Sequence, residues 1–409
     1  MADRRNGSDV LIAGGGLAGL TAALAIVRSA PDLRVEVVDA SAPGTGPSDE
    51  RASAIAAAAR RMLEQLGLWA GLEPEAEPIR AMEITDSRTG DIVRPIFLTF
   101  DASVAEGEPF AHMVANEPLI KALRKAADDA GINVTAPDSV MGYSVSEGHV
   151  AIGLASGEER RARLLVAADG IRSRLRALAG IKTVTWRYRQ AAIVVNVRHE
   201  RPHNGVAVEH FLPGGPFAVL PLKGNRSSLV WTEKSDDAAR LVAGDDFVFL
   251  AELERRFGRR LGDIALDGPR RSYPLGLILA RDFVRPRFAL LGDAAHGIHP
   301  IAGQGLNLGF RDAAALAESV VDAARLGLDI GSLDVLRRYE RWRRYDTWQM
   351  GVMTDVMNRL FSNDLTALRV VRDVGLGLVD RMPRLKELFI GEAAGLGGEL
   401  PKLLKGEAL

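Results

Sequence analysis

The chain of 409 residues is too long for one ordinary hydrophobic core, so its length predicts two domains. Its composition is that of a globular protein, and a net charge of -1 gives no electrostatic reason to expect nucleic-acid binding. The absence of cysteine excludes disulfides, thiolate catalysis, iron–sulfur ligation and thiolate zinc sites, and it agrees with a reducing cytoplasm.

The first predicted elements form a dinucleotide-binding β-α-β unit. An apolar strand at 10–13 runs into the glycine turn 14–19 (GGGLAG), and a helix continues to about Ser29. A second apolar strand at 35–38 ends in Asp39. A strand before the turn, a helix after it and an acid twenty residues further on make this motif far more specific than its glycines alone.

Each glycine of the turn has an expected task. Gly14 makes the tight turn, Gly16 lets the backbone approach a pyrophosphate, and Gly19 lets helix and strand pack closely. The free N–H groups at the start of the helix would bind phosphate, and Asp39 would accept hydrogen bonds from ribose hydroxyls. The cofactor-binding residues predicted in this unit are Gly14, Gly16, Leu17, Ala18, Gly19 and Asp39.

The same stretch has a membrane interpretation. Residues 10–27 carry no charge and follow Arg4 and Arg5, as in a signal peptide. Four glycines and many alanines make the segment only moderately apolar, and its pattern resolves into strand, turn and helix. We therefore expect no membrane insertion here.

A loop rich in glycine, proline and serine (39–50) precedes a predicted helix from about Ala52 to Leu66. Arg51 lies directly before this helix. It is either a solvated surface arginine or a cation beside the bound pyrophosphate.

A strand pair and a meander are predicted next. The pair comprises Ala81–Asp86 and 92–97, joined by a turn at 89–91, and a helix is expected at 116–130. The meander that returns to the main sheet comprises strands at 132–135, 140–144, 150–154 and 163–168.

The last of these strands ends at Asp169 and Gly170, and three arginines follow at alternate positions, 172, 174 and 176. One interpretation is an ordinary strand-to-helix turn with an exposed basic helix start. The other places Asp169 and Gly170 against the cofactor, with the arginines near phosphate or nicotinamide. The residues themselves favour neither.

Residues 185–232 predict a second, antiparallel and substrate-facing sheet. A turn at 213–216 separates two of its strands, a helix at 245–257 follows, and 271–277 is expected to join the same sheet. The strands predicted first are 191–197, 206–211, 217–221 and 227–231.

Residues 288–312 predict a buried strand, a loop and a glycine-opened helix that begins near Gly305. Asp293 at the end of the strand can accept hydrogen bonds from cofactor hydroxyls. Gly303 and Gly305 let the backbone lie against a flat ring, and the positive end of the helix would stabilise negative charge on that ring when it is reduced.

His296 and His299 in the same loop form an HxxH pair. No glutamate or third ligand has a recognisable spacing from them, so we predict no metal site.

Together these stretches resemble the FAD-dependent aromatic hydroxylases, the single-component flavin monooxygenases. Residues 14–19 match their ADP-binding motif, 168–170 their Asp-Gly motif and 292–296 their Gly-Asp motif, in the same order and spacing. A narrower resemblance, to the ubiquinone-biosynthesis hydroxylase subfamily, is carried by 49–69, 292–312 and 211–222 with Trp231. Asp39 departs from the glutamate more common there, and 116–118 also varies.

The predicted fold class is α/β, a Rossmann-like FAD-binding domain interleaved with a mainly antiparallel β-sheet substrate domain, plus C-terminal helices. The FAD-binding domain is expected to be discontinuous (1–75, 105–178 and 278–345). The substrate domain would take 76–104 and 179–277, and the C-terminal helical region 346–409.

The resemblance implies an FAD-dependent monooxygenase with NAD(P)H and O2 as co-substrates, in which a flavin hydroperoxide transfers one oxygen to a phenolic ring. Backbone N–H groups at 300–305 would meet the transition-state charge, so no acid or base is assigned.

No second Rossmann unit is evident, so NAD(P)H would bind transiently near the Asp-Gly arginines; a protein reductant is the alternative. The flavin-ring environment would be Pro300, Gly303, Gln304 and Gly305. Further implied cofactor contacts are Arg51, Asp169, Gly170, Gly292, Asp293, Leu306 and Asn307.

The narrower resemblance implies a polyprenylated phenol of ubiquinone biosynthesis as substrate, with a lean to 2-polyprenyl-6-methoxyphenol. A soluble aromatic acid would require a buried Arg or Lys in the second sheet, and 191–197 and 217–221 carry none. None of the five tryptophans forms a halogenase motif. A reductase or a non-catalytic flavoprotein remains as an alternative, and the ring carbon, prenyl length, electron donor and oligomeric state stay open.

From Asp346 onward the chain is predicted helical, with an apolar face of residues four apart. This face either packs on the catalytic domains or receives a prenyl tail, a membrane surface or a partner of a ubiquinone-synthesis complex. Nearly balanced charges from Arg359 onward give no polybasic membrane signal. We expect a cytoplasmic protein with peripheral contact at the inner membrane. The face is formed by Trp348, Val352, Val356 and Leu360, and Leu378, Met382, Leu385 and Phe389 continue it.

Overall fold

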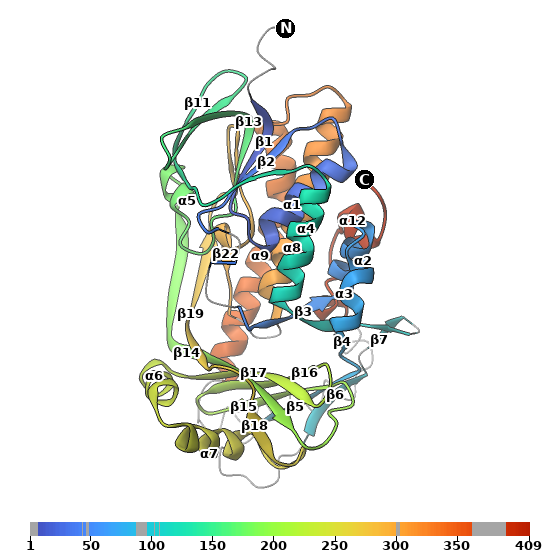
Figure 1. The fold of residues 1–409 in the computed structure, drawn as a ribbon, viewed down its shortest axis with the longest axis vertical. Helices are drawn as coiled ribbons and strands as arrows, with labels where there is room; N and C mark the ends of the chain where they lie inside the picture. Colours follow the sequence, from blue (N-terminus) through green and yellow to red (C-terminus); the bar gives the residue numbers. More distant parts are fainter. Residues whose placement is uncertain are drawn as a thin grey trace.

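Two large β-sheets lie at opposite ends of the long axis of the protein, and a small sheet and a long helix lie between them (Figure 1). The fold is a mixed α/β fold. The computed structural model describes residues 7–42, 44–45, 49–86, 96–101, 103–105, 107–299, 303–361 and 390–409.

The first sheet is Rossmann-like, because its central strands are parallel and β1 is joined to β2 through a helix. Its parallel strands, in spatial order, are β10 (Asn133–Thr135), β2 (Val35–Val38), β1 (Ser8–Ala13), β13 (Glu159–Ala167) and β21 (Phe288–Leu290). The antiparallel strands are β12 (Val150–Leu154), β11 (Val140–Val145) and β20 (Val284–Arg285).

Three helices accompany this sheet, with α1 packed between the other two. The interior strands carry apolar, fully buried stretches (Val10–Ile12, Leu164–Ala167 and Phe288–Leu290), as expected for a sheet covered on both faces. Together with the helices they form the largest core of the protein. The helices are α1 (Leu17–Ser29), α4 (Asn116–Asp129) and α8 (Gln304–Arg325).

The second sheet is mainly antiparallel; its one described parallel pairing joins β15 to β5. Its strands, in spatial order, are β22 (His296–Gly297), β19 (Arg271–Ala280), β14 (Thr183–His199), β17 (Arg226–Lys234), β16 (Gly215–Leu222), β15 (Val206–Leu212), β5 (Ala81–Asp86) and β6 (Ile96–Asp101), and β18 (Ile264–Leu266) also pairs with β14.

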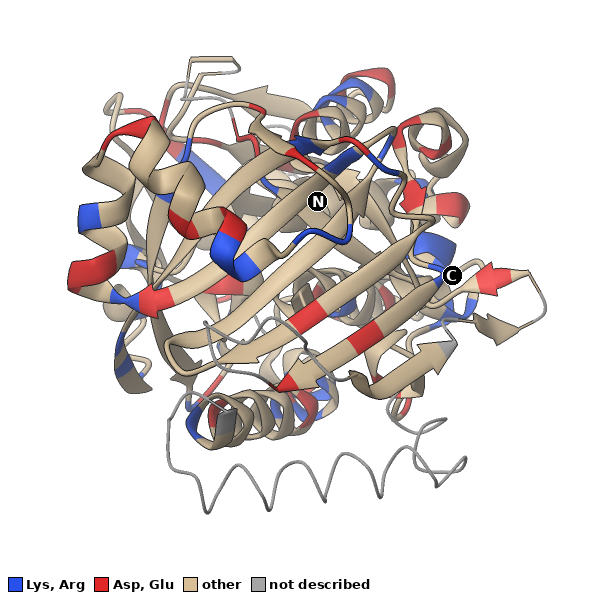
Figure 2. Ribbon diagram, turned by 90° about the horizontal axis from the view of Figure 1, so that it is seen from below, with Lys and Arg blue, Asp and Glu red and all other residues tan. Residues whose placement is uncertain are grey.

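The outer face of the second sheet is covered by α6 (Ser235–Ala243) and α7 (Asp246–Phe257), which close a separate apolar core around Leu229 and Trp231. Figure 2 views this end and shows few charged residues on the central strands. The opposite, inner face points towards the first sheet (Figure 1).

Short elements fill the space between the sheets. A three-stranded sheet packs on the inner face of the second sheet and consists of β3 (Ala52–Ala56), β9 (Ala111–Ala115) and β4 (Glu77–Pro78). The remaining short elements are β7 (Ser103–Ala105), β8 (Glu108–Pro109), α2 (Ala57–Gln65), α3 (Trp69–Leu72), η1 (Glu73–Glu75), α5 (Arg174–Leu178), η2 (Gly292–Ala294) and α12 (Lys402–Lys405).

The long helix α9 (Leu333–Phe361) connects the two ends of the protein. Near its start, the Tyr339 hydroxyl donates to the Leu290 carbonyl oxygen of the first sheet at 2.7 Å. Near its end, Asp355 accepts a hydrogen bond of 2.7 Å from the Tyr188 hydroxyl of the second sheet. Within the part of the chain that the structure describes, no helix has the length and hydropathy needed to cross a membrane.

The apolar pattern of α9 does not mark its buried face. Val352 and Val356 are more than half exposed. The buried residues are small or polar, which lets the helix approach closely; a Cβ added at Gly351 would lie 2.8 Å from Leu279. The buried residues of this stretch are Thr347, Gly351, Thr354 and Asn358. The predicted continuation at Leu378, Met382, Leu385 and Phe389 lies outside the described residues.

The predicted helix at 52–66 is wrong over its first turn. Residues Ala52–Ala56 form strand β3, paired with β9, and the helix begins only at Ala57. Alanine has a high helix propensity, but here backbone pairing with a distant strand overrides it. Helix α6 was not predicted, and the turn at 89–91 lies outside the described residues. The domain boundaries stay a prediction.

The second core has its own stability test. Leu229 is fully buried under α6 and α7, so Leu229→Ala should lower the free energy of unfolding by about 2–5 kcal/mol through lost burial and a residual cavity. Chemical denaturation of the purified protein would measure it. The control is Phe247→Ala on α7, where the ring is 80% exposed. Equal effects of the two substitutions would contradict the assignment of this core.

Candidate functional site

The three motif-bearing stretches meet at one edge of the first sheet. Strands β1, β13 and β21 are parallel neighbours, so the turns that follow them emerge side by side at their carboxyl ends. This is where open α/β sheets bind ligands.

The first glycine turn is fixed by close backbone contacts. Gly14 has a φ of +121°, and a Cβ added there would lie 2.2 Å from the Ala168 carbonyl oxygen. A Cβ added at Gly19 would lie 2.0 Å from the Gly14 carbonyl oxygen. Both positions require glycine, and the turn is locked between β1, α1 and the end of β13.

The start of α1 is open. Among the described residues, no atom lies within 4 Å of a Cβ added at Gly16, and no side chain caps the helix or places an acid in its first turn. The N–H groups of the first turn, at Leu17 and Ala18, are therefore available to an anion. The Ala18 side chain also contacts the third stretch, since a Cβ added at Gly292 would lie 3.1 Å from it.

Asp39 lies over this turn. Its Oδ1 accepts a hydrogen bond of 2.8 Å from the Ser41 N–H, and its Oδ2 would lie 2.5 Å from a Cβ added at Gly15. The structure therefore places the acid that ends β2 beside the glycine turn, where a ribose joined to the pyrophosphate would lie.

Arg51 is held in place rather than freely solvated. Its guanidinium donates to both carboxylate oxygens of Asp49, at 2.7 and 2.8 Å, and lies 5.3 Å from the centre of the Tyr273 ring. The hydrogen bond to Asp49 raises the pKa of Arg51 most, and Asp293 contributes electrostatically. Arg51 is thus near the third stretch, and half of its side chain is exposed.

Asp169 and Gly170 form a tightly bonded turn. The Asp169 carboxylate accepts from the Ser173 hydroxyl at 2.5 Å and from the Leu175 N–H at 3.1 Å, while Gly170 has a φ of +79°. Arg176 donates to the Ala294 carbonyl oxygen at 2.8 Å. The structure therefore supports a helix-start role for Asp169, and it uses Arg176 to tie the second stretch to the third.

The turn after β21 presents Asp293. Gly292 takes a φ of +59°, and Asp293 follows with an exposed side chain in a recess surrounded by protein. Desolvation raises the pKa of Asp293 against the opposing effects of His296 and Arg51. A carboxyl group placed in this way is suited to accept hydrogen bonds from a bound hydroxylated ligand.

A buried ion network, centred on Asp312 of α8, holds this turn. Asp312 Oδ2 accepts from the Gly292 N–H at 3.0 Å and lies 2.6 Å from His296 Nε2, while Oδ1 accepts from Arg343 Nε at 2.8 Å. Burial opposes ionisation of Asp312, but His296 and Arg343 outweigh it and hold its pKa below the usual range. Arg343 also bonds to Asp346.

The start of α8 is formed by Gly303, with a φ of +64° and only 3.4 Å of room towards Ala54. No atom of the residues that the structure describes lies within 4 Å of a Cβ added at Gly305. The Asn307 amide is fully used by the protein: it bonds to the Ala54 carbonyl oxygen and the Ala56 N–H, and so joins α8 to β3.

Two further predicted residues are placed here. Gln304 donates to the Ala393 carbonyl oxygen at 3.2 Å, and Leu306 packs on the main core. Because the side chains of Asn307 and Leu306 are already engaged by the protein, only their backbone groups could contact a cofactor. Pro300 lies outside the described residues.

The HxxH pair has separate surroundings. His296 bonds to Asp312, whereas the buried ring of His299 packs edge-on against Tyr188 at 5.4 Å, and burial lowers the pKa of His299 to about 4. Across the described ranges, no group of three or more His, Asp or Glu residues could hold a metal ion.

Sequence reasoning missed the residues that hold the site together. Tyr339, Arg343 and Asp346 recur at helical spacing on one face of α9, a signal that could have identified a buried polar stripe. Asp312 was visible only as the end of a motif, and its partners are remote in sequence.

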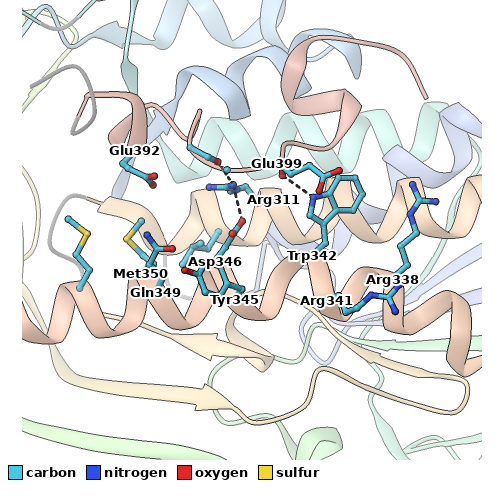
Figure 3. Close-up of a pocket in the computed structure, with 14 residues that line it drawn as sticks. Arg311, Arg338, Arg341, Trp342, Tyr345, Asp346, Gln349, Met350, Glu392 and Glu399 are labelled. Carbon is cyan, nitrogen blue, oxygen red and sulfur yellow. Dashed lines mark hydrogen bonds and ion pairs between the residues drawn. The ribbon is translucent and has the colours of Figure 1, made fainter. Parts of the chain in front are cut away.

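A cavity of about 710 Å³ lies between α8, α9 and residues 392–399 (Figure 3). Arg311 reaches across it to Asp346 and to the Gly397 carbonyl oxygen, at 3.0 and 2.8 Å. The described residues that line it include none of the predicted cofactor contacts, so this cavity is separate from the glycine turns.

The residues at the edge of the first sheet fit an FAD group. Gly14 and Gly19 allow the close turn, the uncapped start of α1 suits a pyrophosphate, and Asp39 suits a ribose. The open start of α8 at Gly303 and Gly305 suits a flat ring.

Comparison with known proteins agrees with this geometry. A family model described as FAD binding domain matches residues 7–351. The ubiquinone hydroxylase UbiL of Rhodospirillum rubrum is 46% identical, with 98% of this chain and 94% of that protein covered. The 3-demethoxyubiquinol 3-hydroxylase of Escherichia coli is 33% identical, with 95% and 99% covered.

The fold is also that of a solved structure, p-nitrophenol 4-monooxygenase PnpA from Pseudomonas putida. The TM-score is 0.80 at 20% identity, and 97% of this chain and 100% of that chain are covered. At this identity the likeness shows the fold alone.

Gly14→Ala should abolish copurification of the flavin and cost more than about 1 kcal/mol of stability, because the new Cβ meets the Ala168 carbonyl oxygen and φ is positive. Visible absorbance and thermal unfolding would measure both. Gly153→Ala on β12 is the control, since no atom lies within 4 Å of its added Cβ. Retention of full flavin absorbance in Gly14→Ala would contradict the prediction.

Asp312→Asn should cost about 3–5 kcal/mol at pH 7, because it removes the fully buried one of the two carboxylates that pair with the buried Arg343. Because the pKa of Asp312 is lowered in the folded protein, its ionised carboxylate contributes fully to the free energy of unfolding above the ordinary aspartate pKa, near 4. That contribution is lost as the pH falls below this value towards the lowered pKa. When the pH is lowered below 4, the free energy of unfolding should therefore fall less in Asp312→Asn than in wild type.

Thermal unfolding between pH 3 and pH 7 would test this. The control is Asp129→Asn on α4, which removes an exposed ion pair and should change stability by less than about 1 kcal/mol. Parallel pH curves for wild type and Asp312→Asn would show that Asp312 does not carry the acid sensitivity.

Proposed function

This chain belongs to the FAD binding domain family, and from that premise we propose that it is an FAD-dependent monooxygenase that hydroxylates the aromatic ring of a polyprenylated phenol in ubiquinone biosynthesis. The observation that carries the proposal is near full-length similarity to the ubiquinone hydroxylase UbiL, at 46% identity. The finer substrate that we propose is 2-polyprenyl-6-methoxyphenol.

The protein's own residues would bind and orient the cofactor. The first turn of α1 would hold the pyrophosphate, Asp39 a ribose, and Asp293 further hydroxyls. Arg51, fixed by Asp49, would add positive charge near the phosphates. When bound, FAD supplies the redox chemistry, taking electrons from NAD(P)H and passing one oxygen atom of O2 to the ring.

The start of α8 would stabilise developing negative charge. No side chain in the described part of the protein caps its N–H groups near Gly303 and Gly305, and the helix is 22 residues long. No acid or base is assigned, because backbone N–H groups rather than a catalytic triad would meet the transition-state charge. The protein's tasks are to position the ring and to exclude water.

The inner face of the second sheet supports a neutral substrate. Among the described inward-facing residues of β15, β16 and β17, no buried one is a lysine or arginine; Arg226 and Lys234, at the two ends of β17, are exposed. A carboxylate-bearing ring would need a buried cation. Arg271 does lie on this face, but on β19, four strands away from β15. A soluble aromatic acid therefore has weaker support.

A prenylated substrate is drawn from a membrane, so we place the protein in the cytoplasm with peripheral contact at the inner membrane. The exposed side chains of Tyr345, Val352 and Val356 along α9 support such a contact, or one with a partner in ubiquinone synthesis. The oligomeric state is left open.

The FAD-loaded protein should oxidise NAD(P)H about tenfold faster with a short-chain 2-prenyl-6-methoxyphenol than without it, and the phenol should gain one oxygen atom by mass spectrometry. The comparison substrate is 4-hydroxybenzoate. Turnover of the acid alone would overturn the substrate class, and no turnover with either would overturn the activity.

A second measurement would identify the ring position. Deleting the gene and extracting the quinones should reveal a prenylated phenol that lacks one ring oxygen. The position that lacks oxygen names the carbon attacked. An unchanged ubiquinone pool would argue against a unique role in that pathway.

A further inference from the structure

Glu209 is a buried acid that the reaction described above does not use. It stands in the middle of strand β15, and only 6% of the residue is exposed. Among the described residues, none forms a hydrogen bond or an ion pair with its carboxyl group, and burial is the single cause that shifts its pKa. An acid buried in this way is costly unless a partner outside the protein satisfies it.

The side chain points to the inner face of the second sheet. Glu209 pairs with Ala218 on β16 and with Ile84 on β5, and paired residues share a face. Ile84 belongs to the inner cluster that contacts the end of α9. The facing residue Ala218 has only a methyl group, so it offers the carboxyl no hydrogen-bond partner.

The neighbours of Glu209 on the same face pack against two different bodies. Phe211 packs with Met357 and Leu360 of α9. Ala207 packs with the cluster that contains Ala54 of β3. Glu209 therefore faces the seam between α9 and the small sheet β3–β9–β4.

This seam leads to the predicted ring-binding end of α8. Ala54 is the residue that a Cβ at Gly303 would approach to 3.4 Å, and its carbonyl oxygen accepts from the Asn307 amide. Gln304 bonds to the Ala393 carbonyl oxygen, and Ala393 packs in the same cluster as Ala207. These contacts connect the seam that Glu209 faces to residues adjoining Gly303 and Gly305.

We infer that Glu209 is a specificity-determining residue whose carboxyl group hydrogen-bonds the oxygen substituent of a neutral phenolic substrate. The inference rests on the proposed function, because it names the group that contacts that substrate. A protonated carboxyl both donates and accepts a hydrogen bond, which suits a phenol with a neighbouring methoxy oxygen. A site built to bond a hydroxyl rejects rings that lack it.

Burial raises the pKa of the Glu209 carboxyl to about 8, so it keeps its proton at neutral pH. Charged groups on the packed elements include Asp86 and Glu83 on β5, Glu77 on β4, Asp355 and Arg359 on α9, and Glu392. None of them is a cause of the shift, and Asp355 is bonded to Tyr188 and Arg359. Above about pH 8, ionised Glu209 loses its donor.

The test compares Glu209→Leu and Glu209→Gln in the FAD-loaded full chain, with 2-prenyl-6-methoxyphenol as probe. Glu209→Leu should lower kcat/KM, and weaken phenol binding measured by flavin absorbance, roughly tenfold to a hundredfold. Glu209→Gln keeps a donor and an acceptor, so it should stay within about threefold at pH 7. It should also remove the fall in wild-type kcat/KM above pH 8.

The matched control is Glu83→Gln on the neighbouring strand β5. Glu83 pairs with Arg260 on the opposite face of the sheet, so this variant should leave phenol binding and the pH profile unchanged. Equal flavin content and thermal midpoints across the variants would show that each is folded.

Two results would overturn the inference. One is wild-type phenol affinity in Glu209→Leu, which would mean that the carboxyl bonds only solvent. The other is an unchanged alkaline fall in Glu209→Gln. Failure of the proposed function gives a different result, namely a wild-type protein that does not hydroxylate the phenol. If that protein still binds the phenol, the binding comparison decides the role of Glu209. If it does not bind the phenol, the inference is overturned as well.

Discussion

The site depends on one buried carboxylate. Asp312 fixes the turn at Gly292 through a backbone N–H, pairs with His296, and is neutralised by Arg343 from α9. A buried ion of this kind is unfavourable without partners, so all of its partners must be in place together. The network thereby couples the ligand-facing turn to the packing of α8 against α9, so that neither is expected to form without the other.

The glycines complement this network by allowing close approach. Gly14 and Gly19 bring β1, α1 and β13 together, and the contact of Ala18 with Gly292 joins that assembly to the turn that Asp312 holds. The glycines at the turns and the charges buried behind them both hold this edge of the sheet rigid. Backbone N–H groups are left at the surface of a rigid edge, which is the form of binding site that phosphates and flat rings require.

The sequence predicted the fold well where local signals and tertiary packing agree. The β1–α1–β2 unit and the strands of the second sheet followed from apolar periodicity and turn residues, with boundaries shifted by a few positions. It failed at Ala52–Ala56, where pairing with β9 overrides alanine's helix propensity, and on α9, where the buried face is small and polar. The partners of Asp312 and the burial of Glu209 depend on contacts between distant segments, which no local pattern encodes.

Strand β14 links the two ends of the protein, so we expect them to unfold together. This strand of 17 residues begins at Thr183, which pairs with Ala280 in the first core, and ends at His199, two residues beyond Val197 in the second core. Backbone hydrogen bonds along one continuous strand couple the two cores, so we expect them to melt in a single cooperative transition rather than one after the other. Damage far from the glycine turns would then appear as cofactor loss, and the amides of β14 would be among the slowest to exchange with solvent.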